Sequence, residues 1–322
     1  MNKLKIGIIG AAGYTGGELI RLLIHHPHCE LVYIHSNSQK GKKLAEVHPD
    51  LLGESDMVFT DQVLTEGLDA VFLGLPHGQT QPFLEQHVFS SGTVLIDLST
   101  DFRDESNGFI YGLPEINRQK IHKAKRIANP GCFATTIQLA LAPMVAQGLV
   151  KGSIHVTGVT GSTGAGKKLS DPTHFSQRNQ NISVYKLFNH QHLKEIMQTF
   201  KLIHPNFEQN LYFVPYRGNF SRGIWVTAYF PYEGSLEDAY SVYEEFYKYA
   251  PFTLVSKSDI DLKQVVNTNK CILHLQKESG QLVVYSILDN LLKGASGQAV
   301  QNFNLAFGLD EKEGLKLKSI AF

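Results

Sequence analysis

The sequence predicts an α/β protein with a Rossmann-type doubly wound parallel sheet and an inserted α+β domain whose sheet is mostly antiparallel. Three observations predict this fold. A glycine-rich turn joins the first strand to the first helix, short apolar runs alternate with helical segments up to residue 130, and alternating strand patterns dominate from residue 153. A chain of 322 residues, 43% of them hydrophobic, has enough apolar material for two cores.

The first domain opens with one βαβ unit. Residues 5–9 form a short apolar run, 16–24 an amphipathic helical pattern, and 30–35 a second strand pattern. Three further apolar runs extend the predicted parallel sheet, at residues 70–75, 93–98 and 126–128. We therefore expect residues 1–130 to bind a dinucleotide.

The pattern changes from Ser153 onward. Alternating segments predict four strands, at residues 153–159, 223–230, 271–276 and 282–288, and helical patterns cover residues 192–202 and 236–250. A last helix is predicted to begin near Ala295, after Gly294. We expect residues 131–295 to form a catalytic and dimerisation domain, and residues 296–322 to return to the first domain.

Charge and cysteine content exclude several function classes. Thirty basic residues balance thirty acidic ones at a pI near 7.2, so no global field favours nucleic acid or an anionic membrane, and we expect a small-molecule partner. Three scattered cysteines form neither a disulfide framework nor a paired metal motif, which is typical of a reducing cytoplasm. No apolar run approaches the roughly 18 residues of a membrane span.

The glycine turn carries the prediction of a nucleotide site. Gly10, Gly13 and Gly16 have the spacing GxxGxxG, which departs from GxGxxG but lies between a predicted strand and helix. In such a turn the exposed amides of the helix start bind a pyrophosphate, and Tyr14 and Thr15, which lie in the turn, are predicted to contact the cofactor. An ordinary glycine-rich turn is the alternative.

The end of the second strand predicts which cofactor binds. An NAD site commonly places a carboxylate at the end of the second strand, whereas in this chain no carboxylate follows that strand until Glu46. It offers the hydroxyls of Ser36 and Ser38 and three lysines within residues 40–43. We therefore predict NADP(H), with a solvated lysine loop as the alternative.

Cys132 is the candidate nucleophile. It follows Asn129-Pro130-Gly131 and begins a predicted helix, where unpaired amides and the helix dipole stabilise a thiolate. A buried structural thiol is the alternative. Cys29 and Cys271 lie inside apolar strand patterns and are predicted to be packing residues.

Thiol chemistry on a carbonyl also needs an acid/base, and histidine fits that role best. The candidates are His190 and His192. Their HxH spacing is also compatible with a metal pair, but no third ligand lies nearby in sequence, so we predict no metal. For either histidine alone, a surface or core position is the alternative.

A second glycine-rich segment, residues 161–168, nearly spells a P-loop. Its last position is Lys168, where a P-loop needs a hydroxyl for Mg²⁺. We interpret it as an amide-rich loop beside the cofactor or an anionic substrate. A surface loop and a P-loop kinase are the alternatives, and failure to bind Mg-ATP would remove the second.

Ten short segments follow one another along the chain, and together they indicate a protein family more specifically than any single motif does. They are GAAGYTGGEL from Gly10, EVHPDL at 46–51, LPHG at 75–78, DLSTDFR at 97–103, YGLPE at 111–115, ANPGCFATT around Cys132, GSTGAGK from Gly161, the HQH region, FVPYRGNFSRGI at 213–224 and DNLLKGASGQAVQN at 289–302. With these segments the chain resembles the N-acetyl-gamma-glutamyl-phosphate reductases of arginine biosynthesis, in the semialdehyde dehydrogenase group. The implied fold is similar to glyceraldehyde-3-phosphate dehydrogenase.

The resemblance implies a mechanism. Cys132 attacks the gamma-acyl phosphate and forms a thioester, NADPH supplies hydride, and His192 exchanges the proton. The family usually shows HRH followed by PE, whereas Gln191 and Leu193-Lys194-Glu195 stand here, so the choice between His190 and His192 stays open.

The resemblance also implies that Asn290 and residues 294–298 hold the nicotinamide end, that the last helix packs onto the first domain, and that the protein is a homodimer or homotetramer. Ser162 and Gly164, in the second glycine-rich loop, are predicted to contact the cofactor. Three basic side chains are predicted to bind the substrate's carboxylate or phosphate: Arg103, Lys186 and Arg217.

Two rival functions remain. A reductase of another acyl phosphate, such as an N-succinyl-glutamyl, aminoadipyl or aspartyl phosphate, would use the same chemistry. Lys186 or Arg222 would accept the extra carboxylate of a succinyl group. A non-catalytic nucleotide-binding sensor would keep the glycine turn but have no need for Cys132, so rapid alkylation of Cys132 would argue against it.

Overall fold

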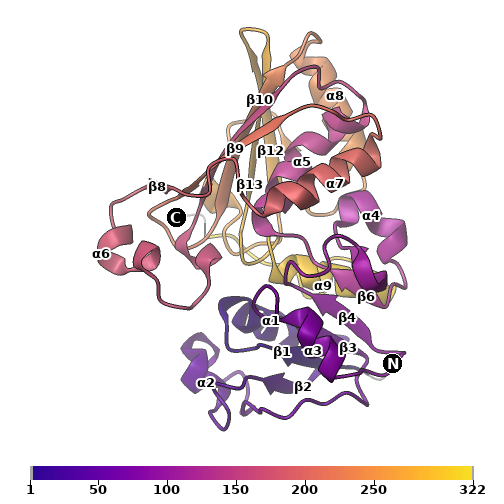
Figure 1. Cartoon of the computed structure of the whole chain (residues 1–322), viewed down its shortest axis with the longest axis vertical. Coiled ribbons are helices and arrows are strands. Elements are labelled where there is room, and N and C mark those ends of the chain that lie inside the picture. The colour runs from indigo at the N-terminus through magenta and orange to yellow at the C-terminus, as the bar shows by residue number, and fades with distance from the viewer. Residues whose placement is uncertain (1–2, 321–322) are drawn as a thin grey trace. The chain divides into compact units, whose positions relative to one another are not determined.

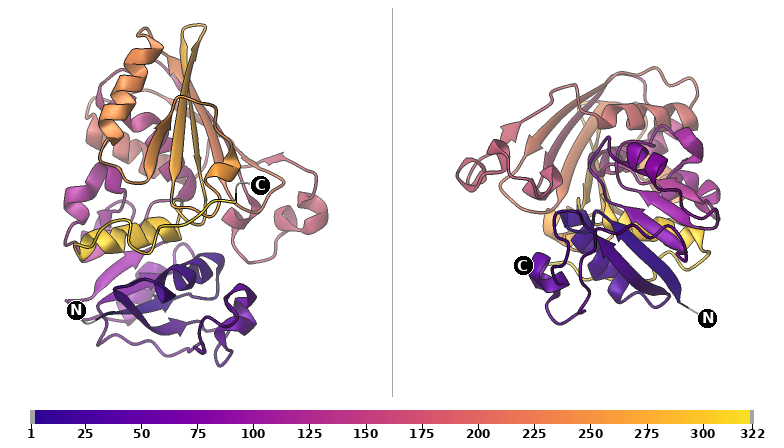
Figure 2. Two further views of the ribbon diagram at one scale, coloured as in Figure 1. Left: turned by 180° about the vertical axis from the view of Figure 1, so that it is seen from behind. Right: turned by 60° about the horizontal axis from the view of Figure 1, so that its bottom comes forward.

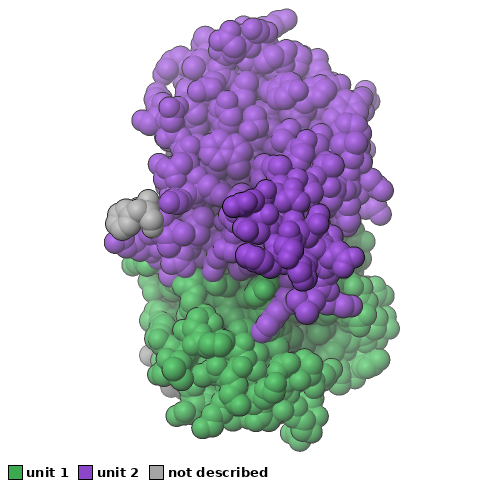
Figure 3. All heavy atoms as spheres, turned by 90° about the vertical axis from the view of Figure 1, so that its left-hand side faces the viewer, with its two compact units in different colours: residues 1–130, 295–316 green, residues 131–294, 317–322 purple. Residues whose placement is uncertain are grey.

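The structure is a computed structural model that describes residues 3–320. The chain forms two compact units, which Figure 3 colours separately. Unit 1 is the described part of Met1–Pro130 together with Ala295–Lys316. Unit 2 is Gly131–Gly294 with the described part of Leu317–Phe322. The second unit is therefore inserted into the first in sequence.

The C-terminal segment differs from the predicted domain boundary. We expected 296–322 to belong to the first domain, but residues 317–320 belong to unit 2, and residue 295 belongs to unit 1. The Ile320 amide donates to the Val266 carbonyl at 3.4 Å, and Asn267 Nδ2 donates to the Lys318 carbonyl at 3.1 Å. The predicted ranges also include residues 1, 2, 321 and 322, which lie outside the described residues.

Unit 1 contains a six-stranded sheet in the order β2-β1-β3-β4-β6-β5, and every pair in it is parallel. Its strands are β1 (Leu4–Ile9), β2 (Cys29–His35), β3 (Ala70–Leu73), β4 (Val94–Asp97), β5 (Ile110–Tyr111) and β6 (Arg126–Ala128). Its helices are α1 (Tyr14–Ile24), α2 (Leu44–Val47), α3 (Thr80–Gln86), α4 (Pro114–Ile121) and α9 (Ser296–Ala306). Since β1 has β2 on one side and β3 on the other, the strand order reverses direction there, and such switch points bind ligands in doubly wound sheets.

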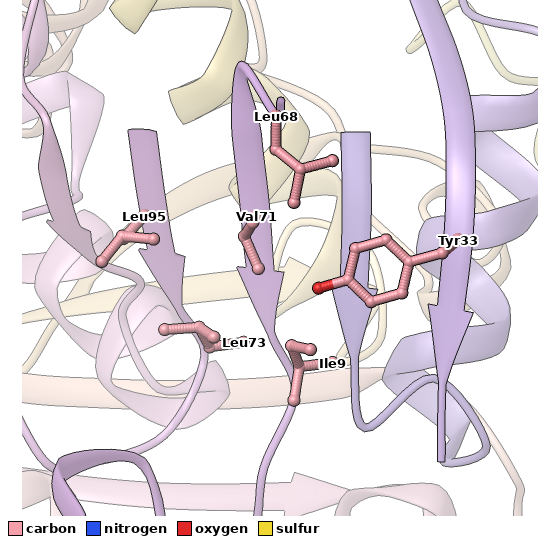
Figure 4. Close-up of a cluster of buried hydrophobic side chains, with 6 residues drawn as sticks. All are labelled: Ile9, Tyr33, Leu68, Val71, Leu73 and Leu95. Carbon is pink, nitrogen blue, oxygen red and sulfur yellow. The ribbon is translucent and has the colours of Figure 1, made fainter. Parts of the chain in front are cut away.

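The core of unit 1 explains why its strands read as continuous apolar runs. All four residues of β3 are buried, as in a parallel sheet covered on both faces. Figure 4 shows the cluster on one side of this sheet. Its buried members are Ile9, Tyr33, Leu68, Val71, Leu73 and Leu95.

Helix α9, near the C-terminal end of the sequence, packs onto the elements of unit 1. It packs against α1, α4 and β4, and the hydroxyl of Ser296 donates to the Thr15 carbonyl at 2.9 Å. The last helix therefore packs onto the first unit, as the family resemblance implied.

Unit 2 contains a seven-stranded mixed sheet in the order β11-β12-β13-β10-β7-β9-β8. Its strands are β7 (Ile154–Thr160), β8 (Ser183–Val184), β9 (Leu211–Arg217), β10 (Ile224–Pro231), β11 (Thr253–Ser256), β12 (Cys271–Glu278) and β13 (Gln281–Leu288). Its helices are α5 (Cys132–Ala146), α6 (Phe175–Arg178), α7 (His192–Ile203) and α8 (Leu236–Tyr247). Four of its strand pairs are antiparallel, and β7–β9 and β11–β12 are parallel, so the mostly antiparallel prediction is confirmed.

Helix α5 forms the centre of unit 2. Every residue from Phe133 to Val145 is buried, and the helix packs against the sheet and against α7 and α8. Pro143 lies inside the helix and cannot donate to the carbonyl of Leu139, four residues earlier. The hydroxyl of Tyr247 in α8 donates to that carbonyl at 2.6 Å. A neighbouring side chain thus satisfies the acceptor that the proline leaves unpaired.

The two faces of this sheet differ. Along β10, residues alternate between buried and accessible, and α5 packs on the buried face (Figures 1 and 2). The other face presents Trp225, Thr227 and Tyr229 from β10. Among residues 3–320, no helix has the length and apolar character needed to cross a bilayer.

Candidate active site

The glycine turn in unit 1 requires its glycines for space. Gly10 has a φ of 75°, and a Cβ there would lie 2.4 Å from the carbonyl oxygen of Gly74, which follows β3. A Cβ on Gly16 would lie 2.4 Å from the carbonyl oxygen of Ala11. The turn therefore closes tightly at the point where the strand order reverses.

This turn presents an anion site at the start of α1. Gly13 is the N-cap, and the first helical hydrogen bond runs from the Gly17 amide to the Gly13 carbonyl at 2.9 Å. The amides of Tyr14, Thr15 and Gly16 precede that bond, so they have no acceptor within the helix. Together with the helix dipole they favour a pyrophosphate. The structure thus brings the predicted phosphate-binding residues together.

Replacing Gly16 by alanine is expected to weaken NADPH binding roughly tenfold or more, because α1 must move away from Ala11 to admit the Cβ. Fluorescence titration with NADPH measures this. Gly92→Ala is the matched control, since a Cβ at Gly92 meets no heavy atom within 4 Å. Equal dissociation constants for Gly16→Ala and wild type would contradict the assignment of the turn.

The end of β2 presents hydroxyls. Ser36 is buried and Ser38 exposed, and their hydroxyl oxygens are 3.4 Å apart. Sequence reasoning missed Asp61. Its neighbour Thr60 forms a parallel bridge with His35, the last residue of β2, so Asp61 lies at this strand end. Lys40 donates to Asp61 at 2.8 Å, and this hydrogen bond lowers the pKa of the carboxyl. The lysine therefore neutralises the Asp61 carboxylate.

The segment DLSTDFR forms a hydrogen-bonded hub after β4. Asp97 is fully buried, and although burial raises its pKa, Thr80 and Ser99 donate hydroxyls to it at 2.9 and 2.7 Å. Arg103, also buried, donates from Nε to the Asn129 carbonyl at 3.0 Å. Its Nη2 donates to the carbonyl of Leu98 at 3.2 Å. These contacts hold strand ends in place, and substrate binding by Arg103 stays a prediction.

Cys132 is the first residue of α5 in unit 2. It is half-buried and follows the N-cap Gly131, so its thiol stands at the positive end of a 15-residue helix. Cys29 and Cys271 are 2% and 0% exposed, and burial raises the pKa of the Cys29 thiol to about 12. Of the three cysteines, only Cys132 has both access and a thiolate-stabilising position.

His190 lies in an aromatic cage. Its ring contacts Phe133, Tyr185 and Phe213 at centroid distances of 5.4–5.8 Å. Burial lowers its pKa to about 4, with further lowering by nearby Lys186 and Arg217. The amide of His192 donates to Nδ1 of His190 at 3.3 Å, which requires an unprotonated Nδ1. His190 is therefore neutral at physiological pH.

His192 has a different environment. It begins α7, is buried, and its Nε2 lies 3.8 Å from Oε1 of Glu195, one helical turn later. Sequence reasoning did not assign a role to Glu195, although the spacing of three residues on a helix places both side chains on one face.

Two further side chains border this site. Arg217, at the end of β9, stacks its guanidinium over the Tyr185 ring at 4.3 Å. Burial raises the pKa of Tyr185, and the proximity of Cys132 raises it further. The structure thus brings Arg217 and Tyr185 into the neighbourhood of Cys132. Lys186 is exposed and donates to Gln191.

The second glycine-rich loop is not a P-loop. Its residues Ser162–Ala165 form a short 3-10 turn, whereas a P-loop continues into an α-helix. Asn290 is buried and fixes this loop: its Oδ1 accepts from the Gly223 amide at 2.7 Å, and its Nδ2 donates to Thr163 Oγ1 at 3.0 Å. Cofactor contacts of Ser162, Gly164 and Asn290 stay predictions.

The residues described, 3–320, bring together no group of three or more His, Cys, Asp or Glu side chains with metal-binding geometry. His190 and His192 lie edge to face, with ring centroids 4.6 Å apart. The HxH pair therefore packs ring against ring.

Comparison with known proteins agrees with this architecture. Residues 5–124 match the semialdehyde dehydrogenase NAD binding domain, and residues 132–290 match the semialdehyde dehydrogenase dimerisation domain. An N-acetyl-gamma-glutamyl-phosphate reductase of Christiangramia forsetii is 53% identical over 98% of this chain and 99% of its own length.

Solved structures share the fold. Aspartate semialdehyde dehydrogenase II of Vibrio cholerae, complexed with ASA, has a TM-score of 0.74 at 16% identity, covering 96% of this chain and 99% of that one. The Candida albicans aspartate semialdehyde dehydrogenase with NADP has a TM-score of 0.68 at 15% identity, covering 94% and 98%.

Proposed function

The chain belongs to the N-acetyl-gamma-glutamyl-phosphate reductases of the semialdehyde dehydrogenase family, and from that premise we propose that it reduces N-acetyl-gamma-glutamyl phosphate to the 5-semialdehyde with NADPH. The observation that carries the proposal is Cys132, an accessible thiol at the start of α5 in the same unit as the His192–Glu195 pair. This reaction serves arginine biosynthesis. It is tested by phosphate-dependent turnover of the semialdehyde, as set out at the end of the Discussion.

Cys132 performs the acyl transfer. The first amides and the dipole of α5 favour its thiolate, which attacks the gamma-carbonyl carbon. The C–O bond to phosphate breaks, and a C–S bond forms. The product is an acyl thioester on Cys132, and phosphate leaves.

His192 carries the proton. Reduction of the thioester leaves an oxyanion that must gain a proton to become the thiohemiacetal on Cys132, and the same hydroxyl proton must leave again as the C–S bond breaks. His192, whose Nε2 lies 3.8 Å from the Glu195 carboxylate, donates this proton and takes it back. The aldehyde is released and the Cys132 thiolate is restored.

The residues of unit 1 fit NADP(H). The glycine turn leaves no room for a Cβ at Gly10 or Gly16, and the amides that start α1 suit the pyrophosphate. Ser36 and Ser38 place hydroxyl donors where a 2′-phosphate needs them, and Lys40 neutralises Asp61 beside them. When bound, NADPH supplies the hydride that reduces the thioester.

Replacing Ser38 by aspartate is expected to lower kcat/KM for NADPH roughly tenfold, because a carboxylate repels the 2′-phosphate. The kcat/KM for NADH, which has no 2′-phosphate, should fall less than that for NADPH or should rise. Steady-state kinetics with both cofactors measure the ratio, and Ser91→Asp, an exposed position in the turn before β4, is the control. An unchanged NADPH/NADH ratio would place the 2′-phosphate elsewhere.

One of the two basic side chains considered for a succinyl carboxylate is engaged by another residue of the chain. Arg222 was one of two candidates for a succinyl carboxylate, but its Nε donates to the fully buried Asp289 at 3.0 Å. That leaves Lys186 as the other candidate, and it lies exposed beside Gln191. Arg217, stacked on Tyr185, is the cation that we expect to bind the alpha-carboxylate.

We also propose that the chain forms a homodimer through the accessible face of the seven-stranded sheet. His155 stacks between Tyr212 and Tyr229 there, at centroid distances of 5.5 and 5.2 Å. A cavity of about 330 Å³ opens among these rings, Phe188 and Val214. A large aromatic face of this kind is typical of a protein interface.

Replacing Tyr229 by glutamate is expected to convert the dimer to a monomer, because it buries a charge in the aromatic face. Light scattering coupled to size exclusion gives the mass. Tyr249→Glu is the matched control, since Tyr249 is 80% exposed and lies after α8. A wild-type mass near 35.9 kDa would contradict the dimer.

The proposed chemistry suits the cytoplasm. A mechanism that depends on the Cys132 thiolate needs a compartment in which thiols stay reduced.

A further inference from the structure

Glu195 occupies a position that the reaction scheme above does not fully use. Its carboxylate is buried in the first turn of α7, between the helix that carries Cys132 and the imidazole of His192. We propose that Glu195 is a positioning residue that holds His192 as the acid/base and fixes the turn that presents Cys132. This inference rests on the proposed function.

One carboxylate oxygen fixes the turn before the nucleophile. Oε2 accepts a hydrogen bond from the amide of Gly131 at 3.1 Å. Gly131 is the N-cap of α5 and directly precedes Cys132, and it has no side chain that could cap the helix. A residue 64 positions later therefore supplies a contact that holds this backbone turn.

The other oxygen faces the acid/base. Oε1 lies 3.8 Å from Nε2 of His192, and the two side chains are only 5% and 7% exposed. Charges so little exposed to water interact more strongly than a surface pair. The carboxylate therefore stabilises His192 when the imidazole gains a proton and loses that interaction when the proton leaves.

The surrounding groups identify the carboxylate as the group that favours a protonated His192. Cys132 borders the site from α5, and Tyr185, Lys186 and His190 lie on the segment before α7. Arg217 borders it from β9. Lys186 and Arg217 are cations that act against protonation of the neighbouring His190, whereas the group 3.8 Å from His192 Nε2 is the Glu195 carboxylate.

The substitution Glu195→Gln separates the two contacts. A glutamine oxygen still accepts from the Gly131 amide, but the side chain no longer carries the charge that faces His192. We expect His192 to titrate at lower pH in Glu195→Gln than in wild type, because the variant lacks the negative charge 3.8 Å from its Nε2. We expect kcat to fall roughly tenfold, with KM for NADPH unchanged.

The direct readout is the NMR titration of ¹³C-labelled histidine in the full chain. The His192 resonance is assigned by its loss in His192→Asn, and the pH–rate profile is recorded on the same variants. Glu245→Gln, an exposed α8 position, is the matched control for the change of charge. Glu195→Asp should restore part of the His192 titration, because it returns a carboxylate on a shorter side chain.

The outcomes are distinct. A lowered His192 titration with a lowered kcat supports the proposal, and a His192 titration in Glu195→Gln that superimposes on wild type overturns it. The proposal is also overturned if Glu195→Ala fails to fold while Glu195→Gln matches wild type in both the His192 titration and the rate. In that case only the contact with the Gly131 amide would matter. The two proposals can also fail separately. If His192 titrates at lower pH in Glu195→Gln but the wild-type protein shows no phosphate-dependent turnover, the Glu195–His192 coupling is supported and the proposed function is defeated.

Discussion

Replacement of Cys132 by serine is expected to lower turnover roughly 10³-fold or more while NADPH binds as in wild type. A serine hydroxyl at the start of α5 does not ionise near neutral pH, so no thioester forms. The glycine turn proposed to bind the cofactor belongs to unit 1, whereas Cys132 belongs to unit 2, so the substitution should leave the dinucleotide site intact. Steady-state kinetics and fluorescence titration with NADPH measure the two effects.

Cys271→Ser is the matched control for this change. Cys271 is fully buried in β12, and its sulfur already lies 3.4 Å from the Ser286 hydroxyl, so a serine there finds a hydrogen-bond partner. We expect its activity to stay near wild type. Substantial turnover by Cys132→Ser would rule out covalent catalysis by this thiol.

Replacement of His192 by asparagine is expected to lower kcat by roughly 10² to 10⁴, the usual contribution of a general acid/base. The same substitution at His190 should change kcat less than about tenfold. The reason is electrostatic, because His190 has a pKa lowered to about 4 and its Nδ1 accepts the His192 amide, whereas His192 faces a carboxylate.

The pH–rate profile distinguishes the two histidines as well. The limb that reports the proton carrier should vanish in His192→Asn and persist in His190→Asn. If the large loss and the missing limb appear only in His190→Asn, the assignment of the acid/base is reversed.

The sequence predicts the parallel sheet well because its strands are apolar on both faces. The runs at 5–9, 70–75 and 126–128 fall on β1, β3 and β6. Strand β9 was missed because Pro215 and partly exposed positions break its alternation. Strand β11 was missed because only Thr253 of its four residues is buried, whereas all four residues of the equally short β3 are buried. Both pair in parallel with neighbouring strands, a feature that no local pattern reveals.

Helix α5 illustrates a limit of local rules. The turn Pro130-Gly131 correctly predicts where the helix begins, at Cys132. Pro143 argues against a helix continuing past it, yet α5 runs to Ala146. The acceptor freed by Pro143 is satisfied by Tyr247, more than 100 residues later, and sequence reasoning has no access to that contact.

The candidate site was predicted where chemistry depends on residue type and local position. Cys132 and the glycine turn follow from the start of a helix and from the size of glycine. Glu195 and Asp61 were missed, because their roles depend on groups brought close by the fold: the Gly131 amide for Glu195, and the end of β2 for Asp61. Long-range contacts also determine that His190 is neutral and that Arg222 is engaged by Asp289.

The reverse reaction tests the central claim most directly. The purified chain is given N-acetylglutamate 5-semialdehyde and NADP⁺ with and without inorganic phosphate, beside the N-succinyl analogue, and formation of NADPH is followed. We predict turnover that requires phosphate, is faster with the N-acetyl substrate and is absent in Cys132→Ser. Turnover without phosphate, or no turnover with either substrate, would contradict the assignment as an N-acetyl-gamma-glutamyl-phosphate reductase.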